Sequence, residues 1–290
     1  SLAYSMLEYG VMNRAGFTVV TGEIGCGKTT LIRHLLDRLD EDFTVGLVSN
    51  IQDGDLLQWV LMAFGQPYEG KSHVALHDEL QQFLIREYAD GRRTILIVDE
   101  AQNLGPKLLE QLRLLSNINA DNDQLLQLIL VGQPQLKELL QAPELVQFAQ
   151  RIASDFHLSP LSVEDIDAYI KHRLHIAGRD LPLFTMDACQ KLYEASRGIP
   201  RIINILADTC LVYGFARMAP EIDGKIVGEV IRDKQTHGIF GVSTPKGVEE
   251  TRASRLPVQT KEEAGEEKSE LVIHDKELAK RIFKKLRSNG

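Results

Sequence analysis

Residues 22–29 read GEIGCGKT, and their types and spacing suit the binding of a phosphate group. Gly22, Gly27, Lys28 and Thr29 match the phosphate-loop pattern, in which two spaced glycines precede Lys and then Ser or Thr. Glycine allows backbone N–H groups to turn inward toward an anion. In such a loop the lysine reaches the β- and γ-phosphates of a nucleotide, and the threonine hydroxyl binds Mg²⁺.

The sequence on either side of this loop favours the same interpretation. Residues 17–21 are a short apolar run typical of a buried strand, and residues 30–36 have helical character. Strand, loop and helix therefore follow in the order that a phosphate loop requires, which a chance glycine turn would not need. The residues predicted to bind nucleotide are Gly22, Glu23, Ile24, Gly25, Cys26, Gly27, Lys28, Thr29 and Thr30.

The chain has three cysteines, which are too few and too scattered for a disulfide framework or a zinc site. Cys189 and Cys210 are expected to be small core residues. Cys26 lies inside the phosphate loop, near Lys28 and the start of a helix, both of which lower a thiol pKa. Redox sensing at Cys26 is therefore one hypothesis, and a permissive loop position is the other.

A second informative stretch, residues 93–100, is an apolar β-branched run that ends in Asp99 and Glu100. Such a run predicts a strand buried on both faces of a parallel sheet, whose carboxyl end faces the ligand. Asp99 is then placed to hold Mg²⁺ through water, and Glu100 to polarise the water that attacks the γ-phosphate. The alternative is that the two acids cap the next helix. A base at this position favours a hydrolase over a passive binder.

A third strand is predicted at residues 125–131, closing on Gly132-Gln133-Pro134. Gln133 emerges where its amide could contact the γ-phosphate or the attacking water, or where it could be an ordinary turn residue. Further strands are predicted at 43–49 and 155–158, with helices at 54–64, 73–90, 105–118, 135–141 and 144–150 between them. Strands alternating with helices predict an α/β, doubly wound, mostly parallel five-stranded sheet of the P-loop NTPase kind.

From Ser162 onward the pattern is helical, with helices expected at 162–176, 185–196, 200–215 and 223–235. The first of these opens with a capping pattern at residues 162–165. Gly198 allows a turn, and Pro200 is favoured at the first position of a helix. Arg201 is therefore expected at a helix N-terminal end, a position suited to contact with a phosphate. We therefore predict a nucleotide-binding domain at 1–160 and an all-helical lid at 161–236.

Residues 237–290 form the third predicted segment. Gly, Ser, Thr, Pro, Lys and repeated Glu between 241 and 270 are typical of a disordered acidic linker. Leu278, Ile282, Phe283 and Leu286 then share one helix face, flanked by lysines and arginines. This basic amphipathic helix is expected either to contact a partner or membrane surface, or to be a solvated tail helix.

Composition bounds the class of protein. A chain of 290 residues, 43% of them hydrophobic, is long enough for two domains with real cores. Its net charge of −8 argues against general coating of nucleic acid, although this charge is still compatible with a local basic patch that binds nucleic acid. No apolar run approaches the roughly 20 residues that span a bilayer, and no signal segment opens the chain, so we expect it to be cytoplasmic. It begins without methionine and already inside an amphipathic pattern, so we expect a truncated N-terminus.

Together these motifs resemble an AAA+ ATPase, and specifically the bacterial ExeA/GspA type, the general secretion pathway protein A family. That type has relatives in pilus and exosortase systems and among the TniB and TnsC transposition ATPases. The resemblance extends over roughly residues 1–235. The matching segments are 16–36, 95–104 (ILIVDEAQNL), 112–117, 128–136 and 198–208 (GIPRIINILAD).

The resemblance implies ATP and Mg²⁺ as cofactors, Gln133 as sensor 1, and Arg201 as sensor 2. It also implies that Arg151 is the finger offered to the ATP of a neighbouring subunit, with Arg113 as another arginine in the same domain. A finger acting between subunits implies a homo-oligomer, either a ring or a filament. Proteins of this type often continue into a membrane span and a peptidoglycan-binding domain, which this sequence lacks; a motor or switch peripheral to the inner membrane is therefore expected.

Three functions follow from these features. The first is an ATP-hydrolysing module that assembles or remodels an envelope secretion or polysaccharide export complex through a protein partner. The second is a DNA-associated AAA+ ATPase that regulates transposition, which would bind DNA through basic surfaces in a salt-sensitive way. The third is a signalling switch that binds ATP and scarcely hydrolyses it. The acidic balance favours the first function over the second, and Glu100 counts against the third.

Overall fold

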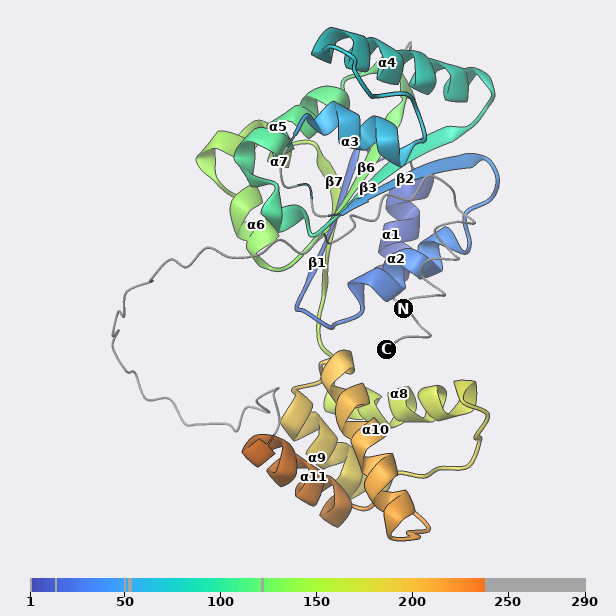
Figure 1. Ribbon diagram of the computed structural model, residues 1–290, viewed down its shortest axis with the longest axis vertical. Coiled ribbons are helices and arrows are strands. Elements are labelled where there is room, and N and C mark those ends of the chain that lie inside the picture. Colours follow the sequence, from blue (N-terminus) through green and yellow to red (C-terminus); the bar gives the residue numbers. More distant parts are fainter. Residues whose placement is uncertain (1, 14, 50, 52–53, 121–122, 238–290) are drawn as a thin grey trace, which may run out of the picture. The chain divides into compact units, whose positions relative to one another are not determined.

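The computed structural model describes residues 2–13, 15–49, 51, 54–120 and 123–237 (Figure 1). These residues form two compact units, one ending at Ser159 and the other beginning at Pro160. The acidic linker and basic amphipathic helix predicted for the tail lie outside the described residues.

The first unit is built on a five-stranded parallel sheet with the strand order β2-β3-β6-β1-β7. The prediction of a doubly wound parallel sheet is confirmed. Its central strands are buried on both faces, as their continuous apolar sequences require, and the edge strands are only half-buried. The strands are β1 (Phe17–Gly22), β2 (Phe43–Ser49), β3 (Arg93–Asp99), β6 (Leu126–Gly132) and β7 (Ile152–Leu158).

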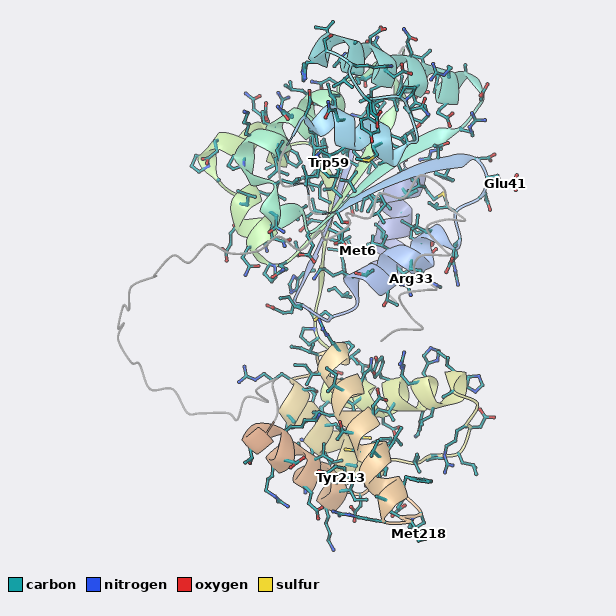
Figure 2. All side chains as sticks on the ribbon, in the orientation of Figure 1. Met6, Arg33, Glu41, Trp59, Tyr213 and Met218 are labelled. Atoms are coloured by element: carbon teal, nitrogen blue, oxygen red, sulfur yellow. The ribbon has the colours of Figure 1, made fainter. Side chains whose placement is uncertain are left out.

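Helices cover both faces of this sheet (Figure 1). One face packs α1 (Leu2–Met12) and α2 (Lys28–Leu36) around Leu7, Leu35 and Ile97. The other packs α3 (Leu56–Ala63), α4 (His73–Ala89), α5 (Gly105–Leu115), α6 (Gln135–Leu140) and α7 (Val146–Ala149). Trp59 of α3 packs against this larger core (Figure 2). All five strands pair in parallel, so their carboxyl ends gather at one edge of the sheet.

Several short elements were absent from the sequence prediction. β4 (Asn119–Ala120) and β5 (Asp123–Gln124) form a two-stranded antiparallel pair, and η1 (Ala101–Asn103) is a single turn. The helix predicted at 144–150 is divided into the turn η2 (Pro143–Leu145) and α7. β7 begins three residues before its predicted start at Asp155. Elements of two or three residues are too short to show a hydrophobic period, and an edge strand alternates polar with apolar residues.

The second unit consists of α8 (Val163–Ile176), α9 (Met186–Ser196), α10 (Pro200–Ala216) and α11 (Gly224–His237). Its core includes Ile166, Leu192, Ile203 and Val227, all fully buried. At the start of α8, the Ser162 hydroxyl donates to the Asp165 carboxylate rather than capping a backbone N–H. Throughout the part of the chain that the structure describes, none of the helices combines the length and the apolar character that crossing a membrane demands.

Candidate nucleotide site

The phosphate loop connects β1 to α2, and its glycines meet different demands. Gly25 and Gly27 have φ angles of 85° and 98°, in the left-handed region that glycine adopts without strain. Gly22 instead allows a close approach, because a Cβ atom there would lie 2.7 Å from the Leu158 carbonyl oxygen on β7. Gly27 immediately precedes α2 and leaves its first N–H groups without a side-chain cap. These groups and the positive end of the helix dipole suit an anion.

Lys28 is folded across the loop that it terminates. Its side-chain ammonium donates to the Gly22 carbonyl at 2.8 Å and to the Glu23 carbonyl at 3.2 Å, and the residue is only 7% exposed. Both acceptors are backbone carbonyls, and none of the acidic side chains that the structure describes forms an ion pair with Lys28. Phosphate oxygens can therefore replace these partners without breaking an ion pair. The neighbouring Thr29 and Thr30 are exposed.

Cys26 is buried in the loop, and the expected lowering of its thiol pKa is wrong. Burial raises the pKa of Cys26, and this effect exceeds the lowering by the nearby Lys28 charge. A protonated, buried thiol is a poor redox sensor. The structure therefore favours the permissive loop position for Cys26.

Asp99 ends β3, and Glu100 follows it in a left-handed conformation with φ 53°. The Asp99 carboxylate accepts the Glu100 backbone N–H at 2.9 Å. Burial raises the pKa of the Asp99 carboxyl, although this hydrogen bond and the Lys28 charge oppose the rise. A left-handed non-glycine residue costs roughly 1–2 kcal/mol, so the backbone turn at Glu100 is held in place by its surroundings.

The oxygen donors near the loop fit a Mg²⁺ ion bound together with a nucleotide. Thr29 offers a hydroxyl and Asp99 a largely desolvated carboxylate, whose charge a cation would stabilise. Among the residues that the structure describes, no group of three His, Cys, Asp or Glu side chains forms a self-contained metal site. This donor set matches Mg²⁺, which uses one or two protein oxygens together with substrate phosphates and water.

Gln133 joins the site through Glu100. Its side-chain amide donates to the Glu100 carboxylate oxygen Oε2 at 3.1 Å. The same oxygen accepts the Gln102 side-chain amide N–H at 2.5 Å, and the Gln102 side-chain amide oxygen accepts the Gln133 backbone N–H at 3.0 Å. Sequence reasoning did not single out Gln102; its position three residues after Asp99, in the turn η1, was the only signal.

Strand register brings these groups to one edge of the sheet. β6 lies between β1 and β3, with Gly132 paired to Thr21 and Leu130 paired to Val98. The phosphate loop, the acidic end of β3 and Gln133 therefore emerge side by side at the carboxyl ends of parallel strands. This is the edge at which open α/β sheets bind ligands.

Arg151 lies at the other end of the sheet. It directly precedes β7, whose first residue, Ile152, pairs with Phe17, while Leu158 pairs with Gly22 at the phosphate loop (Figure 1). Six strand residues separate the two ends, a distance of about 20 Å. The Arg151 guanidinium donates to the Ser116 hydroxyl at 3.0 Å. Arg151 therefore does not reach the phosphate loop of its own chain.

Arg113 is close to Arg151 but differently bound. Its guanidinium makes a bidentate ion pair with Glu110, one turn earlier on α5, with N–O distances of 2.7–2.9 Å. This hydrogen bonding raises the pKa of Arg113 and lowers that of Glu110. Of the two arginines, Arg151 has the weaker intramolecular partner.

Arg201 belongs to the helical unit, at the second position of α10 after Pro200. Gly198, with φ 76°, shapes the preceding turn, since a Cβ atom there would collide with the Leu161 backbone. Arg201 is exposed, and none of the described residues forms a hydrogen bond or ion pair with it. Its guanidinium is therefore available to an anion.

Residues 11–140 match the family model described as the AAA domain. The chain is also 43% identical over 223 residues to general secretion pathway protein A of Aeromonas hydrophila. That similarity covers 76% of this chain and 41% of the relative, so the chain spans less than half the length of the curated relative it matches.

Solved structures share the fold at low sequence identity. The Cdc6p protein of Pyrobaculum aerophilum has a TM-score of 0.60 at 16% identity, covering 83% of this chain and 68% of its own. The ORC2 protein of Aeropyrum pernix has a TM-score of 0.58 at 16% identity, covering 80% and 66%. The Holliday junction branch migration motor RuvB of Thermotoga maritima has a TM-score of 0.53 at 19% identity, with the same coverage as ORC2.

Proposed function

Because this chain is an AAA+ ATPase of the general secretion pathway protein A type, we propose that it couples its nucleotide state to assembly or remodelling of an envelope secretion or polysaccharide export complex. The observation that carries this proposal is the extended similarity to general secretion pathway protein A. The network around Glu100 supports an active hydrolase over a passive nucleotide switch.

The phosphates of ATP bind in the loop at residues 22–30. Backbone N–H groups of the loop and the N-terminus of α2 surround them, while Lys28 turns from its carbonyl partners toward the β- and γ-phosphates. Thr29 and Asp99 would hold Mg²⁺, which would neutralise phosphate charge when it is bound. Since none of the described acidic side chains forms an ion pair with Lys28, its ammonium can turn to the nucleotide by exchanging only carbonyl partners.

Glu100 is the general base for hydrolysis. Its carboxylate accepts a proton from the attacking water as the water oxygen bonds to the γ-phosphorus and the bond to the ADP oxygen breaks. Gln133, which already contacts Glu100, lies at the adjacent strand end and reports the state of the γ-phosphate. The products are ADP and inorganic phosphate.

Two arginines would complete the cycle from outside this edge of the sheet. Arg151 lies too far from its own phosphate loop, so it serves the ATP of a neighbouring subunit in a homo-oligomeric ring or filament. Arg201, exposed at the start of α10, contacts the phosphates as sensor 2 and ties the position of the helical lid, residues 161–236, to the nucleotide. Hydrolysis would then depend on assembly and would move the lid.

The partner is proposed to be a protein of the envelope complex, and the chain to act in the cytoplasm at the periphery of the inner membrane. The basic residues near the end of the 237–290 segment would supply electrostatic contact with anionic lipid. This contact would bring the ATPase to its partner without requiring a membrane span.

The proposal is tested by sedimenting the purified chain with inner-membrane vesicles from its own organism, prepared with and without its secretion or export complex. We expect ATP-dependent binding to the vesicles that contain the complex, strengthened by Glu100→Gln, which retains ATP. Lys28→Ala is the matched control that cannot bind nucleotide. Binding that ignores ATP or the complex would contradict the proposal. ATP-dependent, salt-sensitive binding to duplex DNA in its place would favour transposition control.

A further inference from the structure

Gln102 connects the two strand ends that carry the proposed hydrolytic groups. Its amide nitrogen donates to Glu100 Oε2 at 2.5 Å, and its amide oxygen accepts the Gln133 backbone N–H at 3.0 Å. One side chain thus contacts both the acid after β3 and the polar residue after β6. Each end of its amide has a different function, because one donates and the other accepts.

The end of β6 is shaped to receive this amide. A Cβ atom at Gly132 would lie 2.8 Å from the Gln102 amide oxygen and 2.8 Å from the Leu136 side chain. Any larger residue at position 132 would therefore push Gln102 out of its place. The close fit fixes the amide against the strand end and orients its nitrogen toward Glu100.

The hydrogen bonds distinguish the two oxygens of the Glu100 carboxylate. Oε2 accepts both the Gln102 and the Gln133 amides, whereas no hydrogen bond from a described residue reaches Oε1. Both donors are neutral amides, so neither forms an ion pair with the carboxylate. Holding one oxygen leaves the other directed and free to accept a proton from water.

Resting on the function proposed above, we propose that Gln102 is a positioning residue that holds Glu100 Oε2 so that Oε1 faces the attacking water. Gln102 also ties this orientation to the backbone of Gln133, so a shift at the end of β6 moves the Glu100 carboxylate with it. Hydrogen-bond partners that orient the ligands of a metal site typically contribute about 10- to 100-fold in activity, and we expect an effect of the same order for a partner that orients Glu100. ATP binding, which depends on the loop at residues 22–30, is unaffected.

The test compares kcat, KM and ATP affinity for Gln102→Met and Gln102→Glu in the full chain. Methionine keeps the length of the side chain and removes both hydrogen bonds. Glutamate keeps an acceptor for the Gln133 N–H but loses the donor to Glu100 and repels it. We expect kcat to fall about 10- to 100-fold in both variants, with ATP affinity within about twofold of the wild type. Gln135→Met, the same change on an exposed glutamine, is the matched control.

A double-mutant cycle with Glu100→Gln separates positioning from general damage to the fold. If Gln102 acts through Glu100, Gln102→Met causes no further loss of hydrolysis in the Glu100→Gln background. An equal loss in both backgrounds, a wild-type kcat for Gln102→Glu, or a defect confined to ATP affinity would each overturn the inference. Normal hydrolysis by Glu100→Gln alone would remove the proposed base as well. An inactive Glu100→Gln beside a fully active Gln102→Met would remove only the role of Gln102.

Discussion

Glu87 and Glu100 lie at opposite ends of the same sheet and are bound in opposite ways. Glu87, in the last turn of α4, is 8% exposed and accepts two hydrogen bonds from the Arg92 guanidinium, both at 2.8 Å, and one from Thr44. Arg92 immediately precedes β3, and Thr44 is the second residue of β2. This cluster therefore closes the amino end of the sheet, while Glu100 stands at the carboxyl end.

The difference between the two carboxylates is the charge of their partners. The Arg92 hydrogen bonds hold the pKa of Glu87 below its ordinary value, and its charge is neutralised within the protein. Among the residues that the structure describes, the side chains that donate to the Glu100 carboxylate are the neutral amides of Gln102 and Gln133. A carboxylate paired with a cation stabilises the fold, whereas one oriented by neutral amides on a single oxygen has its second oxygen left for chemistry.

The largest expected effect of a substitution concerns the arginines at the amino end of the sheet. Arg92 forms an ion pair with Glu87, whereas the Arg151 guanidinium donates to the Ser116 hydroxyl and forms no ion pair with a described residue. We expect Arg151→Ala to retain ATP binding and to lower turnover by about 10³- to 10⁵-fold, because a cation at the transferring phosphoryl group would be lost. The measurement is steady-state ATPase activity at a protein concentration that supports assembly.

Mixing Arg151→Ala with Lys28→Ala, which cannot bind nucleotide, should restore part of the activity. Each mixed contact can then combine an intact loop with an intact arginine from the neighbour. Arg113→Ala is the control, since Arg113 is already paired with Glu110. If mixing restores nothing, Arg151 serves only its contact with Ser116.

The next effect concerns the carboxyl end of the sheet. We expect Glu100→Gln to lower hydrolysis about 10²- to 10⁴-fold, because an amide cannot take the proton of the attacking water. ATP affinity and the urea unfolding midpoint should stay near their wild-type values, since none of the described residues pairs a cation with the lost carboxylate. Fluorescent nucleotide binding and phosphate release measure the two properties separately. A large loss of stability would place Glu100 with Glu87 as a structural acid.

Glu87→Gln should have the reverse profile. Replacing the carboxylate weakens its hydrogen bonds to Arg92 and Thr44, and the free energy of unfolding should fall by about 1–3 kcal/mol. ATP turnover per folded molecule should change little, because the cluster lies at the far end of the sheet from the phosphate loop. Urea titration and ATPase assays on the same sample test both halves. Loss of turnover without loss of stability would break the distinction between the two ends.

The smallest effect is the pH dependence of that stability. Because the pKa of Glu87 is lowered in the folded state, the unfolded chain binds more protons at this site between the folded pKa and the ordinary value near 4.5. The contribution is therefore complete above that ordinary value and is lost as the pH falls through the folded pKa. Urea midpoints measured from pH 7 to pH 3 should decline less steeply for Glu87→Gln than for the wild type. Parallel curves would show that Glu87 does not contribute to the pH dependence of stability.

The sequence predicted those parts of the site that are contiguous along the chain. The phosphate loop and the Asp99-Glu100 pair are each visible in a few residues next to an apolar strand. Gln102 was not predicted as a site residue, because its contacts depend on the register between β3 and β6. This register brings residues about thirty positions apart into one hydrogen-bond network. Side-chain amides in a three-residue turn carry no periodic signal.

Burial accounts for another error. The pKa of Cys26 was predicted from its sequence neighbour Lys28, whereas the enclosed position of the thiol determines the direction of the shift. The edge strand β7 was also shortened, because Ala153 and Ser154 do not extend an apolar run. Charges and runs of residues can be read from sequence, but desolvation and strand edges depend on what packs around them.

The separation of Arg151 from its own phosphate loop has a consequence for how activity would grow with assembly. If Arg151 on one side of a subunit serves the phosphate loop on a different side of its neighbour, each contact between subunits is head-to-tail. An open row of subunits then always ends in one unserved loop, so two subunits would contain one complete site and three would contain two. Closing the row into a ring supplies the last site, and specific activity would reach its maximum only at closure.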